Sequence, residues 1–188
     1  MTAPAPRLKL DRSKAVVLVV DVQSRLTPAM PQEALARVVK YGRALVGAAK
    51  ELGMPVIATE QYPKGLGETI PELREVLPQP PLVKMHFSCG ADPAFAAALE
   101  KTGRRQVIVC GMETHVCVFQ TVRDLVGMGY EVHLCADAVS SRAEVHRANG
   151  IELCQQAGAV ITNAETVIFD LLHVAGTPEF KKVSALVK

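Results

Sequence analysis

The chain contains no tryptophan, and aromatic side chains make up only 4% of its 188 residues. It also has no excess of one charge, since 21 Lys and Arg face 19 Asp and Glu for a net charge of +2. Positive and negative side chains alternate, so no basic stripe forms. Nucleic-acid binding usually requires such a stripe, and the sequence gives no indication of it.

Long hydrophobic runs are also missing. The longest uninterrupted apolar run, Ala15 to Val20, is far shorter than the about 20 residues that cross a bilayer. Residues 1–13 carry charges and prolines but no apolar core of an export signal. We therefore expect no membrane partner, and we expect residues 1–13 to form a loosely ordered extension.

The five cysteines are odd in number and scattered, which does not suit a disulfide framework. Cys110 and Cys135 lie inside apolar runs, where we expect core residues. Reduced thiols of this kind are typical of the cytoplasm. The five histidines show no metal-binding spacing, so we expect no metal.

Apolar residues make up 49% of the chain, enough for one packed domain over residues 1–188. Helical patterns alternate with short apolar runs, and the runs predict six strands at Ala15–Val20, Pro55–Thr59, Leu82–Met85, Val107–Cys110, Val132–Ala136 and Ala159–Thr162. This alternation predicts an α/β fold with an open, mostly parallel six-stranded sheet and helices on both faces.

The stretch from Arg105 to Asp137 carries the pattern from which we predict function. An apolar run ends at Gly111, Cys117 follows where a helical pattern begins, and a second apolar run closes on Asp137. A thiol in the first turn of a helix lies near unpaired N–H groups and the positive end of the dipole, which favour thiolate. The spacing alone fits a small core cysteine equally well.

Two further residues fall at the carboxyl ends of predicted strands, where open parallel sheets gather their chemistry. Asp21 follows the first strand, and Lys84 closes the third. An acid, a cation and the thiol of Cys117 can therefore converge in one crevice. Taken singly, Asp21 also fits a turn residue and Lys84 an ordinary surface lysine.

Four segments resemble the isochorismatase-like cysteine hydrolase family: VVDVQ (19–23), LVKMHFS (82–88), CGMETHVCVFQT (110–121) and CADAVSSR (135–142). The run TEQYPKGLG followed by IPEL is most similar to the isochorismatase domain-containing branch. The resemblance implies a three-layer α/β/α fold and a triad of Asp21, Lys84 and Cys117. It also implies a cis peptide between Met112 and Glu113, with the N–H groups of Glu113 and Cys117 forming an oxyanion hole. The family forms dimers and larger rings, so the resemblance implies a homo-oligomer.

The chemistry implied by this resemblance is hydrolysis of a C–N bond of a small amide through a thioester, without a cofactor. Two alternatives stay open: a vinyl-ether hydrolase of isochorismate type, and a non-catalytic regulatory relative with a closed pocket. Some nicotinamidases of the family bind a metal after the second strand. Residues 60–64 here lack the Asp and His set for it, which argues against a required metal.

Five residues near the triad are candidates for substrate binding, and each has an ordinary structural alternative. Gln23 supports Asp21 or faces solvent, Tyr62 walls the substrate or covers a helix, and His115 contacts substrate or lies exposed in a first helical turn. Phe87 and Ser88 line the pocket or serve packing and capping. The sequence does not identify the substrate.

Overall fold

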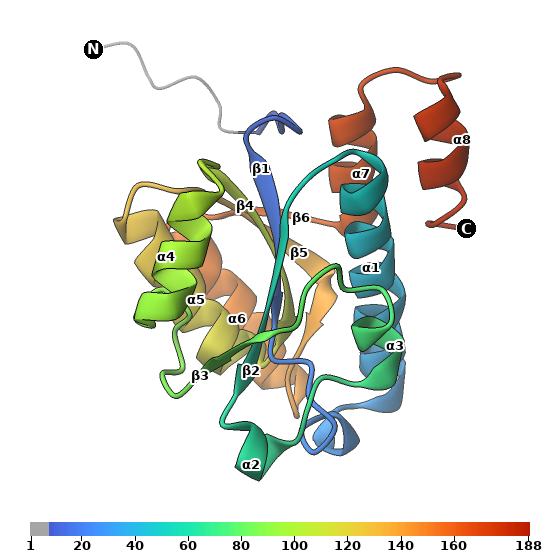
Figure 1. The fold of residues 1–188 in the computed structure, drawn as a ribbon. Coiled ribbons are helices and arrows are strands. Elements are labelled where there is room, and N and C mark those ends of the chain that lie inside the picture. The colour runs from blue at the N-terminus through green and yellow to red at the C-terminus, as the bar shows by residue number, and fades with distance from the viewer. Residues whose placement is uncertain (1–7) are drawn as a thin grey trace.

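A computed structural model describes residues 8–188, and one six-stranded sheet forms its centre (Figure 1). The strands are β1 (Ala15–Val20), β2 (Val56–Gln61), β3 (Leu82–Lys84), β4 (Gln106–Met112), β5 (Glu131–Ser140) and β6 (Val160–Thr162). They lie in the order β3-β2-β1-β4-β5-β6, and every pairing is parallel. The predicted open sheet is confirmed, and it is parallel throughout these pairings.

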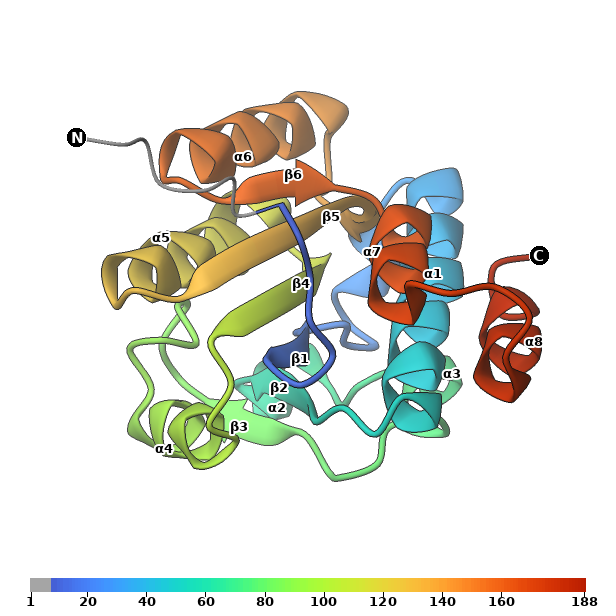
Figure 2. The ribbon, with the colours of Figure 1, turned by 90° about the horizontal axis from the view of Figure 1, so that it is seen from above.

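Helices cover both faces of the sheet, so the predicted three-layer architecture is also confirmed (Figures 1 and 2). One face carries α4 (Pro93–Lys101), α5 (Phe119–Gly127) and α6 (Glu144–Gln156). The other carries α1 (Gln32–Glu51), α3 (Pro71–Arg74), α7 (Ala164–Leu172) and α8 (Pro178–Ser184). Between β2 and α3 lies the short α2 (Pro63–Leu66).

The central strand β1 explains why the sequence reads as an unbroken apolar run. All six of its residues are buried, and successive side chains point to opposite faces. Val17 and Val19 join the core under α1, whereas Val16 and Leu18 join the core under α4 and α5. A parallel strand covered on both faces has no solvent-facing position, which removes the alternation of an exposed sheet.

Strand β5 is the element on which the sequence was least informative. We expected it to end at Asp137, but it continues to Ser140 through an irregularity opposite Val109 and Gly111 of β4. Asp137 therefore lies within the strand, and its carboxylate accepts a hydrogen bond from the N–H of Ala164 at the start of α7. The sequence suggested that Asp137 ends the strand because a carboxylate rarely lies inside one. The bulge in β5 turns this side chain toward the start of α7 instead.

The chain just before β1 contacts the domain at Leu10. Leu10 is buried, and its N–H donates to Asp170 on α7. Residues 1–7 lie outside the described residues, so the loosely ordered extension over residues 1–13 stays a prediction. Among residues 8–188, no helix combines the length and apolar character needed to span a membrane. The single domain over 1–188 stays a prediction.

Candidate active site

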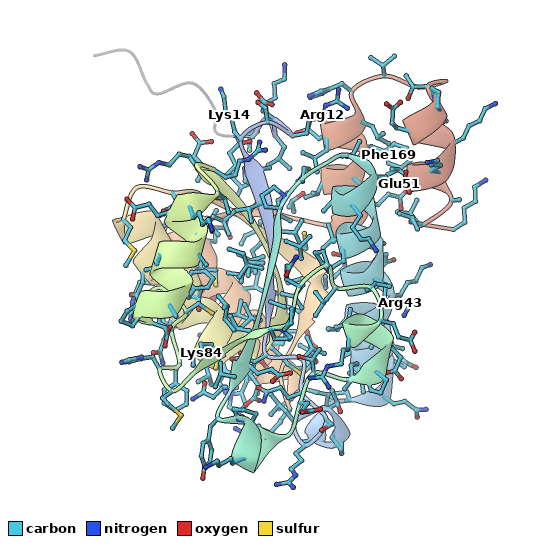
Figure 3. All side chains as sticks on the ribbon, in the orientation of Figure 1. Arg12, Lys14, Arg43, Glu51, Lys84 and Phe169 are labelled. Atoms are coloured by element: carbon cyan, nitrogen blue, oxygen red, sulfur yellow. The ribbon has the colours of Figure 1, made fainter. Side chains whose placement is uncertain are left out.

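Three predicted residues come from separate segments and lie at the carboxyl edge of the sheet. Asp21 directly follows β1, Lys84 ends β3, and Cys117 lies in the turn after β4. Figure 3 shows Lys84 at the end of the sheet where α2 is found. Parallel strands bring their carboxyl ends to one edge, which explains how distant residues meet there.

Asp21 and Lys84 form a buried ion pair with 2.6 Å between Nζ and Oδ2, and each side chain is 1% exposed. The Thr59 hydroxyl donates to the other carboxylate oxygen at 2.7 Å. Lys84 also donates to the carbonyls of His86 and Phe87. Burial is the largest single effect and lowers the pKa of Lys84. The charge and hydrogen bond of Asp21, together with the nearby Cys89 and Cys117, outweigh it, so the net shift of the pKa is upward. The ammonium is therefore held charged.

Cys117 occupies a different backbone setting from the one expected. It lies in a single π-helical turn, Thr114–Val118, and the α-helix begins only at Phe119. Burial raises the pKa of its thiol, and the negative charge of Asp21 raises it further. Burial and the nearby carboxylate therefore oppose the thiolate that a helix terminus was expected to favour.

Gln61 links the thiol to the ion pair and was missed from the sequence. Its Oε1 accepts hydrogen bonds from the Cys117 thiol and from Lys84 Nζ, each at 3.2 Å. Its Nε2 donates to the carbonyl of Met85. The strand predicted from the sequence ends at Thr59, but β2 extends two residues further, to Gln61. Recognising Gln61 as a strand end would have placed it at the same edge as Asp21.

A cavity of about 370 Å³ opens over these groups. Asp21, Gln61 and Cys117 contribute to its lining, and Glu113 and Arg142 add a second acid and base. The remaining lining side chains are apolar: Leu26, Ala29, Leu66, Phe87 and Val116. Such a space suits a small molecule that presents a reactive carbonyl to the sulfur.

Of the predicted substrate-binding residues within the described chain, only Phe87 lines this cavity. Gln23 is buried beside it and donates to the carbonyls of Gln61 and Gly67, so it braces the loop around α2. The Ser88 hydroxyl donates to the carbonyl of Gln120 at the start of α5. Tyr62 is exposed with a left-handed backbone. Their contact with substrate stays a prediction.

His115 does not line the cavity but contacts two neighbours, and its contact with substrate stays a prediction. Its Nδ1 lies 3.0 Å from the Ser141 hydroxyl, and its ring stacks on His146 of α6 with 4.7 Å between centroids. The sequence separates these two histidines widely, so their pairing could not be inferred from spacing. No group of three or more His, Cys, Asp or Glu side chains suited to a metal ion occurs among residues 8–188.

Two glycines let the backbone around Cys117 pack closely. At Gly111, where φ is +118°, a Cβ would lie 2.1 Å from the carbonyl oxygen of Val20. At Gly150 a Cβ would lie 2.8 Å from the backbone nitrogen of His115 in the π turn. The peptide between Met112 and Glu113 is cis, as predicted. The oxyanion-hole role of the Glu113 and Cys117 N–H groups stays a prediction.

Comparison with known sequences places this chain among described relatives. The profile of the family described as Isochorismatase domain matches residues 15–166. Isochorismatase domain-containing protein 1 of Danio rerio is 37% identical over 179 residues, which cover 95% of this chain and 62% of that protein. The secreted isochorismatase effector Isc1 of Phytophthora sojae is 41% identical over 180 residues, covering 93% of this chain and 84% of that protein. The chain thus spans less than two thirds of the zebrafish relative.

Three solved structures have the same fold over nearly the whole chain. The MAR1 ribonuclease from Caenorhabditis elegans has a TM-score of 0.88 and 36% identity, covering 95% of this chain and 92% of that one. The YcaC product of Escherichia coli, described as an octameric hydrolase of unknown specificity, has a TM-score of 0.89 and 26% identity at 98% and 91% coverage. YcaC of Pseudomonas aeruginosa, described with covalent acrylamide, has a TM-score of 0.87 and 26% identity at 95% and 91% coverage.

Proposed function

Because the chain belongs to the isochorismatase family, we propose that it is a cysteine hydrolase that cleaves the C–N bond of a small amide through a thioester. The observation that carries this proposal is the hydrogen-bonded cluster of thiol, carboxamide, ammonium and carboxylate under one cavity. A thiol beside a base and an orienting cation is the arrangement expected of an activated nucleophile.

The first step forms the thioester. In the resting site the Cys117 thiol donates to Gln61. When substrate enters, the thiol proton turns toward Asp21. Asp21 takes the proton, and the sulfur attacks the amide carbonyl to give a tetrahedral oxyanion. The N–H groups of Glu113 and Cys117 stabilise this oxyanion, an effect worth about 3–4 kcal/mol per donor. Because burial keeps the thiol protonated at rest, the thiolate forms only as it reacts.

The second step releases both products. Protonated Asp21 gives its proton to the departing nitrogen, the C–N bond breaks, and ammonia or an amine leaves. Asp21 then removes a proton from water, which attacks the thioester carbonyl and breaks the C–S bond. The proton returns to the sulfur, so the cycle ends with the acid product and the original thiol. Lys84 keeps the Asp21 carboxylate oriented throughout.

The test is an amidase screen that measures ammonia release from a panel of small amides. We expect turnover by the natural chain and none by Cys117→Ser or Cys117→Ala, with both variants folded by circular dichroism. A thioester trapped on Cys117 and seen by mass spectrometry would establish the intermediate. Undiminished turnover by Cys117→Ala would remove the covalent mechanism.

A second candidate activity comes from the C. elegans structure, which is described as a ribonuclease. Two acids and one base line the cavity, Lys84 is buried beneath it against Asp21, and the chain carries a net charge of only +2. A polyanionic substrate gains little from such a surface, so we propose a small amide instead. Assays with a labelled RNA and with isochorismate belong beside the amide panel. Cleavage of either, lost in Cys117→Ser, would replace the amide.

We also propose that the protein is a homo-oligomer of the cytoplasm. The E. coli structure is described as octameric, and large apolar side chains are exposed on the C-terminal segments, at Phe169, Val174 and Leu186. All five cysteines are free thiols, which a reducing compartment preserves. Light scattering after size-exclusion chromatography will give the mass, and a monomer at micromolar concentration would contradict the assembly.

A further inference from the structure

The charged groups around the cavity are paired with one another. Asp21 is bound to Lys84, and Glu113 is bound to Arg142. Each pair contains one acid and one base, so the formal charge of these four lining or adjoining groups sums to zero. A ligand that enters the cavity therefore finds no cation without an anionic partner among them.

Glu113 and Arg142 differ in how far their side chains are exposed to solvent, and this difference gives each a separate role. The side chain of Glu113 is 10% exposed, whereas that of Arg142 is 58% exposed. Oε1 of Glu113 accepts from Nε of Arg142 at 2.9 Å and from its backbone N–H at 3.3 Å. The buried acid thus fixes both the side chain and the backbone of the arginine. Without Glu113, Arg142 would present an unpaired guanidinium to the cavity.

The other walls offer nothing to a charged substituent. Besides the groups of the reaction, the lining consists of apolar side chains from the loop after β1, α2, the loop after β3 and the π turn, namely Leu26, Ala29, Leu66, Phe87 and Val116. A carboxylate in contact with such walls loses its hydration and gains no partner in return. An uncharged group of the same shape loses much less.

We propose that the cavity selects uncharged substrates and that Glu113 enforces this selectivity by neutralising Arg142. This inference rests on the proposed function, because that proposal makes the substrate an amide. It narrows the substrate class to neutral amides of short aliphatic or aromatic acids. Amides that carry a carboxylate at the far end of the acyl chain are excluded. Glu113 acts through its side chain here, separately from its backbone N–H.

The charge selectivity can be measured without any turnover, by alkylating Cys117. Iodoacetamide and iodoacetate differ mainly in charge, and each rate is divided by its rate with 2-mercaptoethanol at the same pH. We expect the normalised iodoacetate rate of the natural chain to be about tenfold or more below that of iodoacetamide. Mass spectrometry assigns the product to Cys117, and Cys117→Ala is the blank.

Three variants test the role of Glu113. Glu113→Gln should raise the ratio of iodoacetate to iodoacetamide rates about threefold, because Arg142 is then free to attract the anion. The double variant Glu113→Gln with Arg142→Gln should return the ratio to that of the natural chain. Glu144→Gln is the matched control, since it removes an exposed acid paired with Arg147, and neither residue lines the cavity. It should leave the ratio unchanged.

The same variants can be compared on butyramide and on succinamate, in which a carboxylate replaces the terminal methyl group. We expect kcat/KM to favour butyramide in the natural chain and the preference to shrink in Glu113→Gln. Equal normalised rates for the two alkylating agents in the natural chain, or a ratio in Glu113→Gln that matches the control, would overturn the inference. If no amide is turned over while the alkylation ratios behave as expected, the hydrolase proposal fails and the charge selectivity stands.

Discussion

At the scale of single residues, the surroundings of Cys117 keep its thiol protonated until substrate binds. Its thiol donates to Gln61, and both burial and the charge of Asp21 raise its pKa. Alkylation by iodoacetamide should therefore rise about tenfold per pH unit up to pH 9 and show no plateau there. Rates from pH 6 to 10, read by mass spectrometry on Cys117, give this profile.

The variant Asp21→Asn is the matched comparison for the pH dependence of Cys117 alkylation. It removes the negative charge that raises the thiol pKa, so alkylation at pH 8 should be faster than in the natural chain. A plateau below pH 8 in the natural chain would mean that the resting site holds a thiolate and that the assigned charge balance is wrong.

The ion pair of Asp21 and Lys84 makes a second prediction at this scale. Lys84→Met leaves a buried carboxylate without its cation, which should lower the free energy of unfolding by about 3–5 kcal/mol. The double variant Asp21→Asn with Lys84→Met removes both charges and should recover much of this loss. Urea unfolding at pH 7 measures all three, and a double variant as unstable as the sum of the single changes would contradict the pairing.

The sequence predicted Asp21, Lys84 and Cys117 because each lies at or after the end of a recognisable strand and matches a family motif. It did not identify Gln61, since the predicted strand stopped at Thr59, two residues before the end of β2. The pairing of Glu113 with Arg142 was also out of reach. Those residues meet only because β5 runs four residues beyond its apolar pattern, to Ser140, and carries Arg142 back to the turn after β4.

At the scale of elements, the strands were predicted better than the turns between them. Apolar runs mark β1 and β4 because burial on both faces leaves no polar position. The π turn at Thr114–Val118 has no sequence signature of its own, and its helical spacing is indistinguishable from the start of an α-helix. The placement of Cys117 relative to the helix was therefore wrong, although its place on the sheet edge was right.

The contact between α6 and the π turn depends on Gly150. A Cβ there would lie 2.8 Å from backbone atoms of Thr114 and His115, and backbone atoms cannot rotate away. Gly150→Ala should lower the free energy of unfolding by about 1–3 kcal/mol and reduce turnover, because the turn that carries Cys117 must shift.

Gly127→Ala is the control for this substitution. It lies in α5, and a Cβ there meets nothing within 4 Å, so alanine should be neutral or stabilise by about 0.5–1 kcal/mol. Urea unfolding of both variants is the measurement. If Gly150→Ala is as stable as Gly127→Ala, α6 does not support the turn as described.

At the scale of the whole molecule, the five thiols act together because all are buried. Burial raises the pKa of Cys89 to about 11 and those of Cys110 and Cys154 to about 12, and it raises those of Cys117 and Cys135 as well. In the unfolded chain the same thiols ionise near their ordinary value of 9.0. At pH values between the unfolded-state and the folded-state pKa, the thiols of the unfolded chain lose protons that those of the folded chain keep.

The sign of the effect follows from proton linkage. Stability from protonated thiols is fully present below about pH 8.5–9 and is lost as pH rises toward the folded-state pKa values. Each thiol should contribute a slope of about −1.4 kcal/mol per pH unit to the free energy of unfolding. The free energy of unfolding, measured with urea in reducing buffer from pH 7 to 10.5, should therefore be flat at first and then fall steeply.

Cys110→Ala removes one wholly buried thiol outside the site, and the slope of its free energy of unfolding should be shallower by about 1.4 kcal/mol per pH unit. Identical slopes in the two chains would show that the buried thiols do not set the alkaline limit of this fold.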